Sequence, residues 1–361
     1  MRSRYYYSLI VLLLAAGTVC SAQNVIVKHN DPHIHFTGRV RMQDDAAEIW
    51  WPSTSLKLYF KGTSVKITLQ DEHGENYFNI IVDDKPASVL HVDSVQTEYT
   101  LASGLPDTNH SVELFKRTGW ASGRTLFYQF SLDKNARLLL PPPAKKRKME
   151  FFGNSITCGV GAEDPSGDKN NEVKYANSYL SYAALTARHF DAEFHNTSLS
   201  GIGLMVSWFP LTMPEMYNRL DPNDAESLWD FKKFVPDVVV VNVFQNDSWI
   251  VKLPDNEQFK AKFGNKAPSD DQIIKAYRNF VKTIRNIYPK SYIICALGSM
   301  DAVKPGSPWP GYIEKAVSDL NDKKILTHFF TYKNTPAHPT VQEHQAMANE
   351  LIAFIDKNVS W

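Results

Sequence analysis

The sequence predicts two domains of different class, an all-β antiparallel sandwich followed by an α/β domain built on a parallel sheet. Between residues 26 and 140, short segments alternate apolar and polar residues and are separated by turn residues. From residue 149 onward, apolar strand segments alternate with helical segments. The first pattern is typical of antiparallel sheets, and the second of a parallel sheet covered by helices on both faces. A chain of 361 residues is long enough to bury two hydrophobic cores.

The first 22 residues have the composition of a secretory signal peptide. Two arginines lie within residues 1–7, an apolar run covers residues 8–17, and small residues at Ser21 and Ala22 form a cleavage pattern. The apolar run is shorter than the roughly 20 residues that span a bilayer. Cys20 would also fit lipoprotein processing, but Val19 before it is bulky, so we favour cleavage after Ala22. The mature protein is therefore expected to be secreted or periplasmic, with no membrane contact.

The sandwich is predicted for residues 23–143. Alternation between apolar and polar residues marks six strand segments, at 56–60, 64–69, 77–82, 98–101, 110–115 and 125–130. No helical pattern interrupts them. Three prolines at 141–143 enforce an extended backbone, and the basic run at 145–148 follows directly, so the second domain is predicted for residues 144–361.

The second domain is predicted to alternate strands with helices. The strand segments are 149–152, 192–196, 237–243, 292–297 and 325–330, and the helical segments are 175–188, 270–288, 311–321 and 341–357. Segment 237–243 is apolar on both faces, as a central strand should be. Right-handed crossovers would gather the carboxyl ends of the strands at one edge, where ligands bind. Segment 253–268 lacks periodicity and is expected to be a loop near that edge, such as a lid or cleft wall.

Polar motifs follow four of these strand ends. Ser155 lies just past the first, at a junction where free helix amides can stabilise a negatively charged oxygen. Gly201 follows the second strand, Asn246 the third and His338 the fifth. A serine before a helix is usually an ordinary cap, but the four together supply a nucleophile, a main-chain amide, a side-chain amide and a base. Acyl transfer requires these parts.

The order and spacing of these blocks resemble the SGNH, or GDSL-type, hydrolase superfamily. The blocks read Gly153-Asn154-Ser155, Ser200-Gly201, Asn246-Asp247 and His338-Pro339. Further segments at 38–39, 50–52, 59–63 and 110–117 resemble the jelly-roll domain of carbohydrate esterase family 2. The resemblance implies a jelly-roll sandwich beside a flavodoxin-like α/β/α hydrolase. It also implies deacetylation of sugars and polysaccharides such as xylan and mannan, with no metal or other cofactor.

Carried over by position, the resemblance makes Ser155 the nucleophile and His338 the general base and acid. It places the oxyanion hole at the backbone amides of Ser155 and Gly201 and the side chain of Asn246. The superfamily often has an aspartate two or three residues before the histidine, where this chain has Pro336 and Thr335. We therefore expect a Ser155–His338 dyad whose imidazole bonds a main-chain carbonyl near Thr335.

Other chemistry-bearing residues have plainer interpretations. Trp208, Trp249 and Trp309 lie in loops beyond strand ends, where each could stack on a sugar ring or pack in the core. The His33 and His35 pair lacks further ligands nearby, so surface positions are expected rather than metal binding. His344 and Asp247 are interpreted as structural. The two cysteines of the mature chain, Cys158 and Cys295, are expected to be buried and unpaired.

The sequence thus predicts a serine esterase that removes acetyl groups from poly- or oligosaccharides. Equal numbers of basic and acidic residues, 39 each, give no basic excess for binding nucleic acid. Two alternatives stay open: a general esterase or lipase of the same superfamily, and a non-catalytic carbohydrate-binding protein. The glycan, the preferred hydroxyl group and the oligomeric state are left open.

Overall fold

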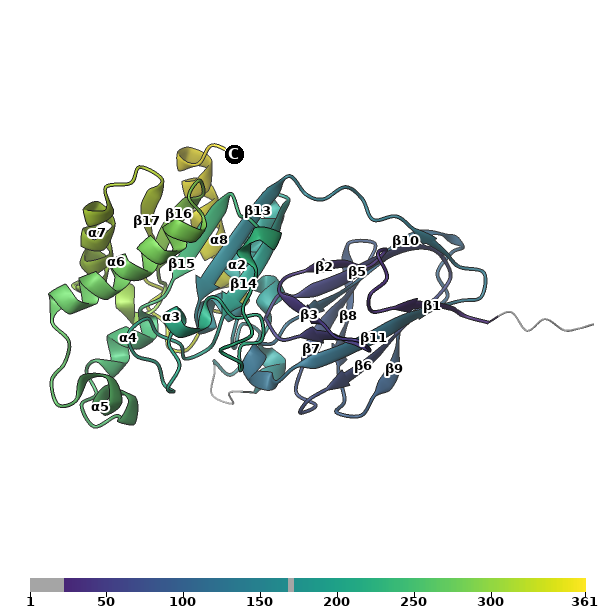
Figure 1. The fold of residues 1–361 in the computed structure, drawn as a ribbon, viewed down its shortest axis with the longest axis horizontal. Coiled ribbons are helices and arrows are strands. Elements are labelled where there is room, and N and C mark those ends of the chain that lie inside the picture. The colour runs from purple at the N-terminus through teal and green to yellow at the C-terminus, as the bar shows by residue number, and fades with distance from the viewer. Residues whose placement is uncertain (1–22, 168–171) are drawn as a thin grey trace, which may run out of the picture.

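The computed structural model describes residues 23–167 and 172–361, and the expected signal peptide at 1–22 lies outside this range. Figure 1 shows a sandwich on one side and a helix-covered sheet on the other. Segment 140–146 connects the last strand of the sandwich to the first strand of the parallel sheet. Within the described residues, no helix has the length and apolar character needed to cross a membrane.

The sandwich consists of two antiparallel sheets. One has the order β3-β4-β11-β6-β9 with β1 beside β11, and the other has the order β12-β5-β10-β7-β8 with β2 beside β5. The strands are β1 (Val25–Lys28), β2 (His35–Thr37), β3 (Val40–Met42), β4 (Ala47–Ile49), β5 (Ser55–Gly62), β6 (Val65–Asp71), β7 (Tyr77–Val82), β8 (Lys85–His91), β9 (Thr97–Ala102), β10 (Thr108–Lys116), β11 (Thr125–Leu132) and β12 (Arg137–Leu139).

Alternation along these strands builds the sandwich core. In β5, Leu56, Leu58 and Phe60 are fully buried, while the residues between them are polar or partly exposed. Val112 and Leu114 of β10 join the same core. The apolar faces of the two sheets therefore pack against each other, as the sequence pattern predicts for an antiparallel sandwich.

The second domain has a five-stranded, all-parallel sheet in the order β14-β13-β15-β16-β17. Its strands are β13 (Arg147–Gly153), β14 (Ala192–Ser198), β15 (Val238–Asn242), β16 (Tyr292–Leu297) and β17 (Ile325–Phe329). Its α-helices are α1 (Ser155–Cys158), α2 (Tyr182–His189), α3 (Met213–Met216), α4 (Gln245–Ile250), α5 (Glu257–Phe263), α6 (Asp270–Ile287), α7 (Trp309–Leu320) and α8 (Val341–Asn358). The predicted sandwich and α/β fold are confirmed.

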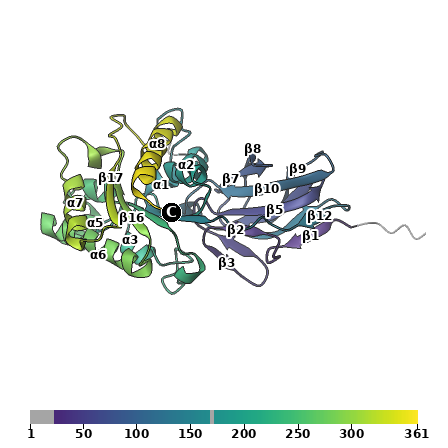
Figure 2. The same ribbon diagram turned by 90° about the horizontal axis from the view of Figure 1, so that it is seen from above.

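Helices cover both faces of the parallel sheet, which Figure 2 shows most clearly. Helices α6 and α7 pack with one set of strand residues, including Phe152, and helices α2 and α8 pack with the alternating set, including Phe151. The expected loop at 253–268 instead contains helix α5. Its ends are set by Asn256, whose side chain accepts two backbone N–H groups, and by Gly264 at a φ of 65°.

The two domains share buried contacts. Trp50 and Trp51 of the sandwich belong to the core on the α6 and α7 side of the sheet. Arg39, 1% exposed, reaches from the sandwich to donate a hydrogen bond of 2.9 Å to Glu150 on β13, which is completely buried. The same guanidinium donates to the carbonyl oxygens of Tyr217 and Arg219. A buried ion pair therefore joins the sandwich to the central sheet.

Candidate active site

The strand register places the motif-bearing loops at one edge of the parallel sheet. Gly153, the last residue of β13, lies between Ser198 on β14 and Asn242 on β15, and these are the last residues of their strands. Ser155 follows the end of its strand by two residues, Gly201 by three and Asn246 by four. Because parallel strands end at the same edge, the three segments emerge side by side.

Ser155 is the first residue of the short helix α1. Asn154 caps that helix by accepting the backbone N–H of Ile156 at 3.1 Å. A Cβ atom at Gly153 would lie 2.0 Å from the Thr157 hydroxyl oxygen, so only glycine permits this tight turn. Ser155 itself is 6% exposed and lies at the helix N-terminus, where unpaired amides favour negative charge.

Gly201 begins the loop that follows β14. Its φ of 84° is in the left-handed region, and an added Cβ would come within 3.0 Å of the Phe209 ring. The loop is joined to the serine segment by the Leu199 N–H, which donates to the Gly153 carbonyl oxygen at 3.3 Å. The loop therefore needs a glycine at this position, where other residues would be strained.

The carboxylate of Asp247 holds the same loop. It accepts the backbone N–H groups of Leu204 at 2.8 Å, Met205 at 2.7 Å and Val206 at 3.1 Å. The side chain is completely buried, and burial raises its pKa to about 6, although the three amide hydrogen bonds act in the opposite direction. Asp247 has the local structural role expected from the sequence.

The Asn246 side chain is fixed at both ends of its amide. Its Nδ2 donates to the Ile202 carbonyl oxygen at 2.7 Å, and its Oδ1 accepts the indole N–H of Trp208 at 3.0 Å. An amide nitrogen carries two hydrogens, so the bond to Ile202 leaves one for a reacting oxygen. The sequence did not predict the Trp208 contact, because it joins residues 38 positions apart.

Helix α4, which carries Asn246, begins at an unusual backbone position. Phe244 has a φ of 85°, which is costly for a residue with a side chain. Its buried ring is held between the rings of Tyr277 and Trp309, each at a centroid distance of 4.9 Å. Packing of the Phe244 ring against Tyr277 and Trp309 therefore maintains the turn at which α4 begins.

The contact with Phe244 also decides between the two expected positions of Trp309. Its ring is 2% exposed and packs in the core. A role in sugar stacking does not fit a ring covered on both sides. Trp208, by contrast, is 44% exposed, and Trp249 is partly exposed, with its indole N–H directed to Asp301 at 3.2 Å. These two tryptophans, and not Trp309, present aromatic surface at this edge of the sheet.

His338 lies in the loop between β17 and α8, one residue after Ala337, whose φ is 68°. Helix α8 begins with a capping box formed by Thr340 and Glu343. The Val341 N–H donates to the Ala162 carbonyl oxygen at 3.1 Å, and the Val160 N–H in the same short loop bonds the Ser155 carbonyl oxygen, also at 3.1 Å. The histidine loop is therefore bonded to the loop that follows the serine.

Tyr182, at the start of α2, is bonded to three separate segments of the domain: α1, the end of β15 and α8. Its hydroxyl bonds the Thr157 hydroxyl at 3.0 Å and accepts the Asn242 side-chain amide at 3.1 Å. Its backbone N–H donates to Nδ1 of His344 at 3.3 Å. His344 is fully buried, and burial, together with the electrostatic effect of the neighbouring His338, lowers its pKa to about 3. His344 is therefore neutral and structural, and Tyr182 is a positioning residue that the sequence alone did not reveal.

The remaining histidine candidates, His33 and His35, lie in the sandwich domain. His33 bonds Asp31 at 2.7 Å, and His35 lies on β2. Among residues 23–167 and 172–361, no cluster of three or more His, Cys, Asp or Glu side chains is arranged to hold a metal ion. Cys158 and Cys295 are both buried and free, as predicted.

Comparisons with known proteins match both domains. Residues 36–143 match the family described as "Carbohydrate esterase 2 N-terminal", and residues 151–346 match the "GDSL-like Lipase/Acylhydrolase family". A solved structure of a family two carbohydrate esterase from Clostridium thermocellum, in complex with cellohexaose, is 31% identical with a TM-score of 0.80. The match covers 90% of this chain and 98% of that one. A family two carbohydrate esterase from Cellvibrio japonicus has the same fold, with a TM-score of 0.82 at 24% identity over 92% of this chain and 97% of that chain.

Two curated relatives extend the comparison. The cellulase/esterase CelE of Acetivibrio thermocellus is 32% identical over 344 residues, and the match covers 92% of this chain but 40% of the relative. An acetylxylan esterase/glucomannan deacetylase of Cellvibrio japonicus is 26% identical over 341 residues, covering 92% of this chain and 90% of the relative.

The fold and these matches define a serine carboxylic-ester hydrolase of the GDSL-like class. Within that class, the chain belongs to carbohydrate esterase family 2.

Proposed function

We propose that this carbohydrate esterase removes O-acetyl groups from plant-type polysaccharides or oligosaccharides, such as xylan and glucomannan, through an acetyl-serine intermediate. The observation that carries the proposal is the convergence of Ser155, Gly201 and Asn246 at one edge of the sheet, with the His338 loop bonded beside them. Two curated relatives named acetylxylan esterase/glucomannan deacetylase support the substrate class.

In the proposed first step, the Ser155 hydroxyl oxygen attacks the acetyl carbonyl carbon while His338 takes the hydroxyl proton. The carbonyl oxygen becomes negatively charged and accepts the backbone N–H groups of Ser155 and Gly201 and one hydrogen of Asn246 Nδ2. The intermediate collapses as the bond to the sugar oxygen breaks, and His338 returns its proton to that oxygen. The sugar hydroxyl leaves, and the acetyl group stays on Ser155.

In the second step, His338 takes a proton from water, and the hydroxide oxygen attacks the acetyl carbon. The same three donors hold the second oxyanion, acetate leaves, and the proton returns to the Ser155 oxygen. The donors are held in place before the reaction by Asp247, Trp208 and the turn at Phe244. Donors fixed in advance stabilise developing charge without reorganisation during the reaction.

We further propose that a main-chain carbonyl, and not a carboxylate, orients the His338 ring. Pro336 and Thr335 occupy the positions where the superfamily often has an aspartate. The Lys333 ammonium bonds the carbonyl oxygens of Thr335 and Pro336, each at 3.1 Å, and so holds the backbone of this loop. A crystal structure with a carboxylate bonded to the His338 ring would refute this dyad.

Trp208 and Trp249 are proposed to contact the sugar that carries the acetyl group. Both present aromatic surface near the reacting edge, and sugar rings have apolar faces that pack well on aromatic rings. The signal-like sequence at residues 1–22 supports a secreted or periplasmic protein, where such polysaccharides are accessible.

The test is mass spectrometry of acetylated xylan and glucomannan fragments before and after treatment, with Ser155→Ala as the control. Loss of acetyl groups with the native protein and none with the variant is the expected result. Comparison of 4-nitrophenyl acetate with 4-nitrophenyl octanoate separates a deacetylase from a lipase. Faster cleavage of the octanoate, or oligosaccharide binding without hydrolysis of any ester, would contradict the proposal.

A further inference from the structure

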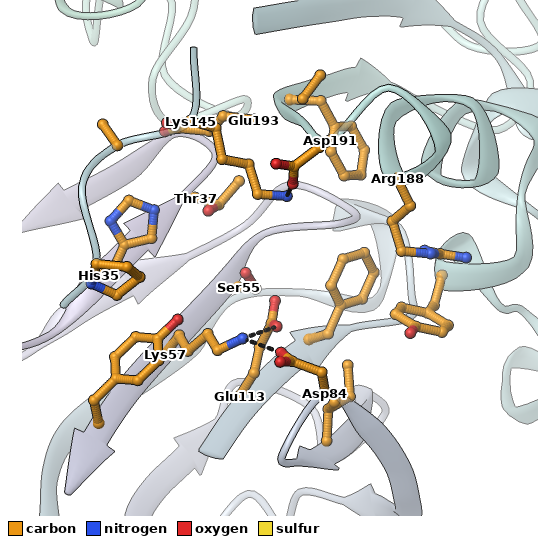
Figure 3. A pocket seen from close by; sticks show the side chains of 18 of the residues that line it. His35, Thr37, Ser55, Lys57, Asp84, Glu113, Lys145, Arg188, Asp191 and Glu193 are labelled. Atoms are coloured by element: carbon orange, nitrogen blue, oxygen red, sulfur yellow. Dashed lines mark hydrogen bonds and ion pairs between the residues drawn. The ribbon is translucent and has the colours of Figure 1, made fainter. Parts of the chain in front are cut away.

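A cavity of about 400 Å³ lies between the two domains (Figure 3). Its walls come from the outer face of one sandwich sheet, from the linker at 142–145, and from the start of β14 with the end of α2. The volume is within the range of small-molecule sites. The cavity is therefore large enough for one or two sugar units, and it lies outside the site described above.

The cavity and the catalytic residues are at opposite edges of the parallel sheet. Asp191, Ala192 and Glu193, at the amino end of β14, line the cavity, whereas Ser198 at the carboxyl end lies beside Gly153. A seven-residue strand is roughly 20 Å long at about 3.3 Å per residue. A ligand in the cavity thus cannot contact Ser155 through the same sugar unit.

The floor of the cavity is formed by alternating residues that face away from the sandwich core. Ser55, Lys57 and Tyr59 alternate with the core residues of β5, and Glu113 and Phe115 do so on β10. Aromatic and polar groups thus lie next to each other on this face. Such a mixture suits a ligand that has apolar faces and many hydroxyl groups.

Most of the charges around the cavity are paired. Lys57 bonds Asp84 and lies 3.8 Å from Glu113, and Lys145 bonds Asp191 at 3.0 Å. Figure 3 shows these two groups on different sides of the cavity. Paired ions can still donate to and accept from hydroxyl groups, and because Lys57 faces two carboxylates they offer no excess positive charge to attract an anionic ligand. A purely apolar ligand would desolvate them at a cost.

Arg188 supplies a donor that is not satisfied within the protein. Its guanidinium carbon lies 3.8 Å from the centre of the Tyr179 ring, and both residues line the cavity. Its Nη1 is buried and has no hydrogen-bond partner among the described residues. Buried donors are usually bonded, so this guanidinium has an unmet hydrogen bond beside the cavity.

From this geometry we propose that the cavity is a second, non-catalytic binding site for a neutral oligosaccharide. The inference rests on the proposed carbohydrate substrate. The four acidic side chains, Asp84, Glu113, Asp191 and Glu193, accept sugar hydroxyls, and Arg188 and the two lysines donate to them. With four acids against three bases, an anionic sugar is disfavoured. A chain held here raises the effective concentration of its other acetylated units at the catalytic edge.

The test is calorimetric titration of the full protein with mannohexaose and xylohexaose. Arg188→Met replaces the guanidinium with an apolar side chain of similar length beside Tyr179, and Glu113→Gln removes one charge without changing the side-chain volume. Lys61→Met is the matched control, because Lys61 is exposed on the same strand and does not line the cavity. Thermal unfolding of each variant checks that it has folded.

We expect two binding sites in the native protein and in Lys61→Met. In both cavity variants, one of the two sites should bind at least tenfold more weakly. The inference is overturned if Glu113→Gln and Arg188→Met bind like the native protein. It is also overturned if the native protein has a single site that neither variant weakens. Hydrolysis of 4-nitrophenyl acetate by the native protein tests the proposed function separately. The protein can bind an oligosaccharide in the cavity without being an esterase, and it can be an esterase without binding one there.

Discussion

Asp247 gives a prediction whose size follows from the structure. The carboxylate is buried, and its pKa of about 6 lies above the ordinary value of 3.8. The folded protein therefore binds a proton at a pH where the unfolded chain has already released it. This carboxyl group stabilises the fold progressively as the pH falls through about 6, and this stabilisation is lost as the pH rises through that value.

The substitution Asp247→Asn removes this titration and nearly preserves the shape of the side chain. Between about pH 7.5 and about pH 5, a carboxyl with this pKa shift adds about 1.4 kcal/mol to the free energy of unfolding. The native protein should gain this amount relative to the variant. Urea unfolding of both proteins at the two pH values measures it, and the subtraction cancels the contributions of other titrating groups.

Turnover of the same variant tests the role of Asp247 in the site. In the variant, the asparagine NH₂ group would face the Leu204 N–H, so two donors would meet. The hydrogen bond from Leu204 to a charged acceptor would be lost, and such a bond is worth about 1.5–3 kcal/mol. If that loss loosens the Gly201 loop, kcat for 4-nitrophenyl acetate falls at least tenfold. Equal pH dependence of unfolding in the two proteins, or unchanged kcat, would refute this reasoning.

Three further substitutions test other contacts. Asn246→Ala should lower kcat by about 10²–10³ in a protein that still folds, because one oxyanion donor is lost; unchanged turnover would remove Asn246 from the site. Trp208→Phe removes the bond to Asn246 and should lower kcat a few-fold, consistent with a hydrogen bond worth about 1 kcal/mol; steady-state kinetics show whether kcat or KM changes. Arg39→Met leaves Glu150 buried without its partner and should cost about 3–5 kcal/mol in urea unfolding; a loss below about 1 kcal/mol would show that the pair does not stabilise the domain contact.

The parts of the fold that the sequence predicted are those with strong local patterns. The strand at 292–297 has the predicted bounds, and helix α6 ends one residue earlier than predicted. Strand β8 was not predicted, because it is an exposed edge strand with a proline and no clear alternation. Helix α2 begins at Tyr182 and not at 175, because the side chain of Ser181 accepts a backbone N–H and caps it there.

For the site, the sequence indicated the strand ends but not the contacts that support them. The order of Ser155, Gly201, Asn246 and His338 was visible as spaced motifs. The bonds of Tyr182 to Thr157 and Asn242, and the packing of Trp309 on Phe244, join residues far apart in the chain. No local pattern encodes such pairings, so Trp309 could be distinguished from an exposed tryptophan only by its burial in the folded chain.

The most direct test of the central claim is identification of the acetylated residue during turnover. The protein is mixed with excess 4-nitrophenyl acetate, quenched in acid within the first turnover, digested and analysed by peptide mass spectrometry. The account predicts one added acetyl group on the peptide that contains Ser155, and none in Ser155→Ala. An acetyl group on a different residue, or normal turnover by Ser155→Ala, would contradict it.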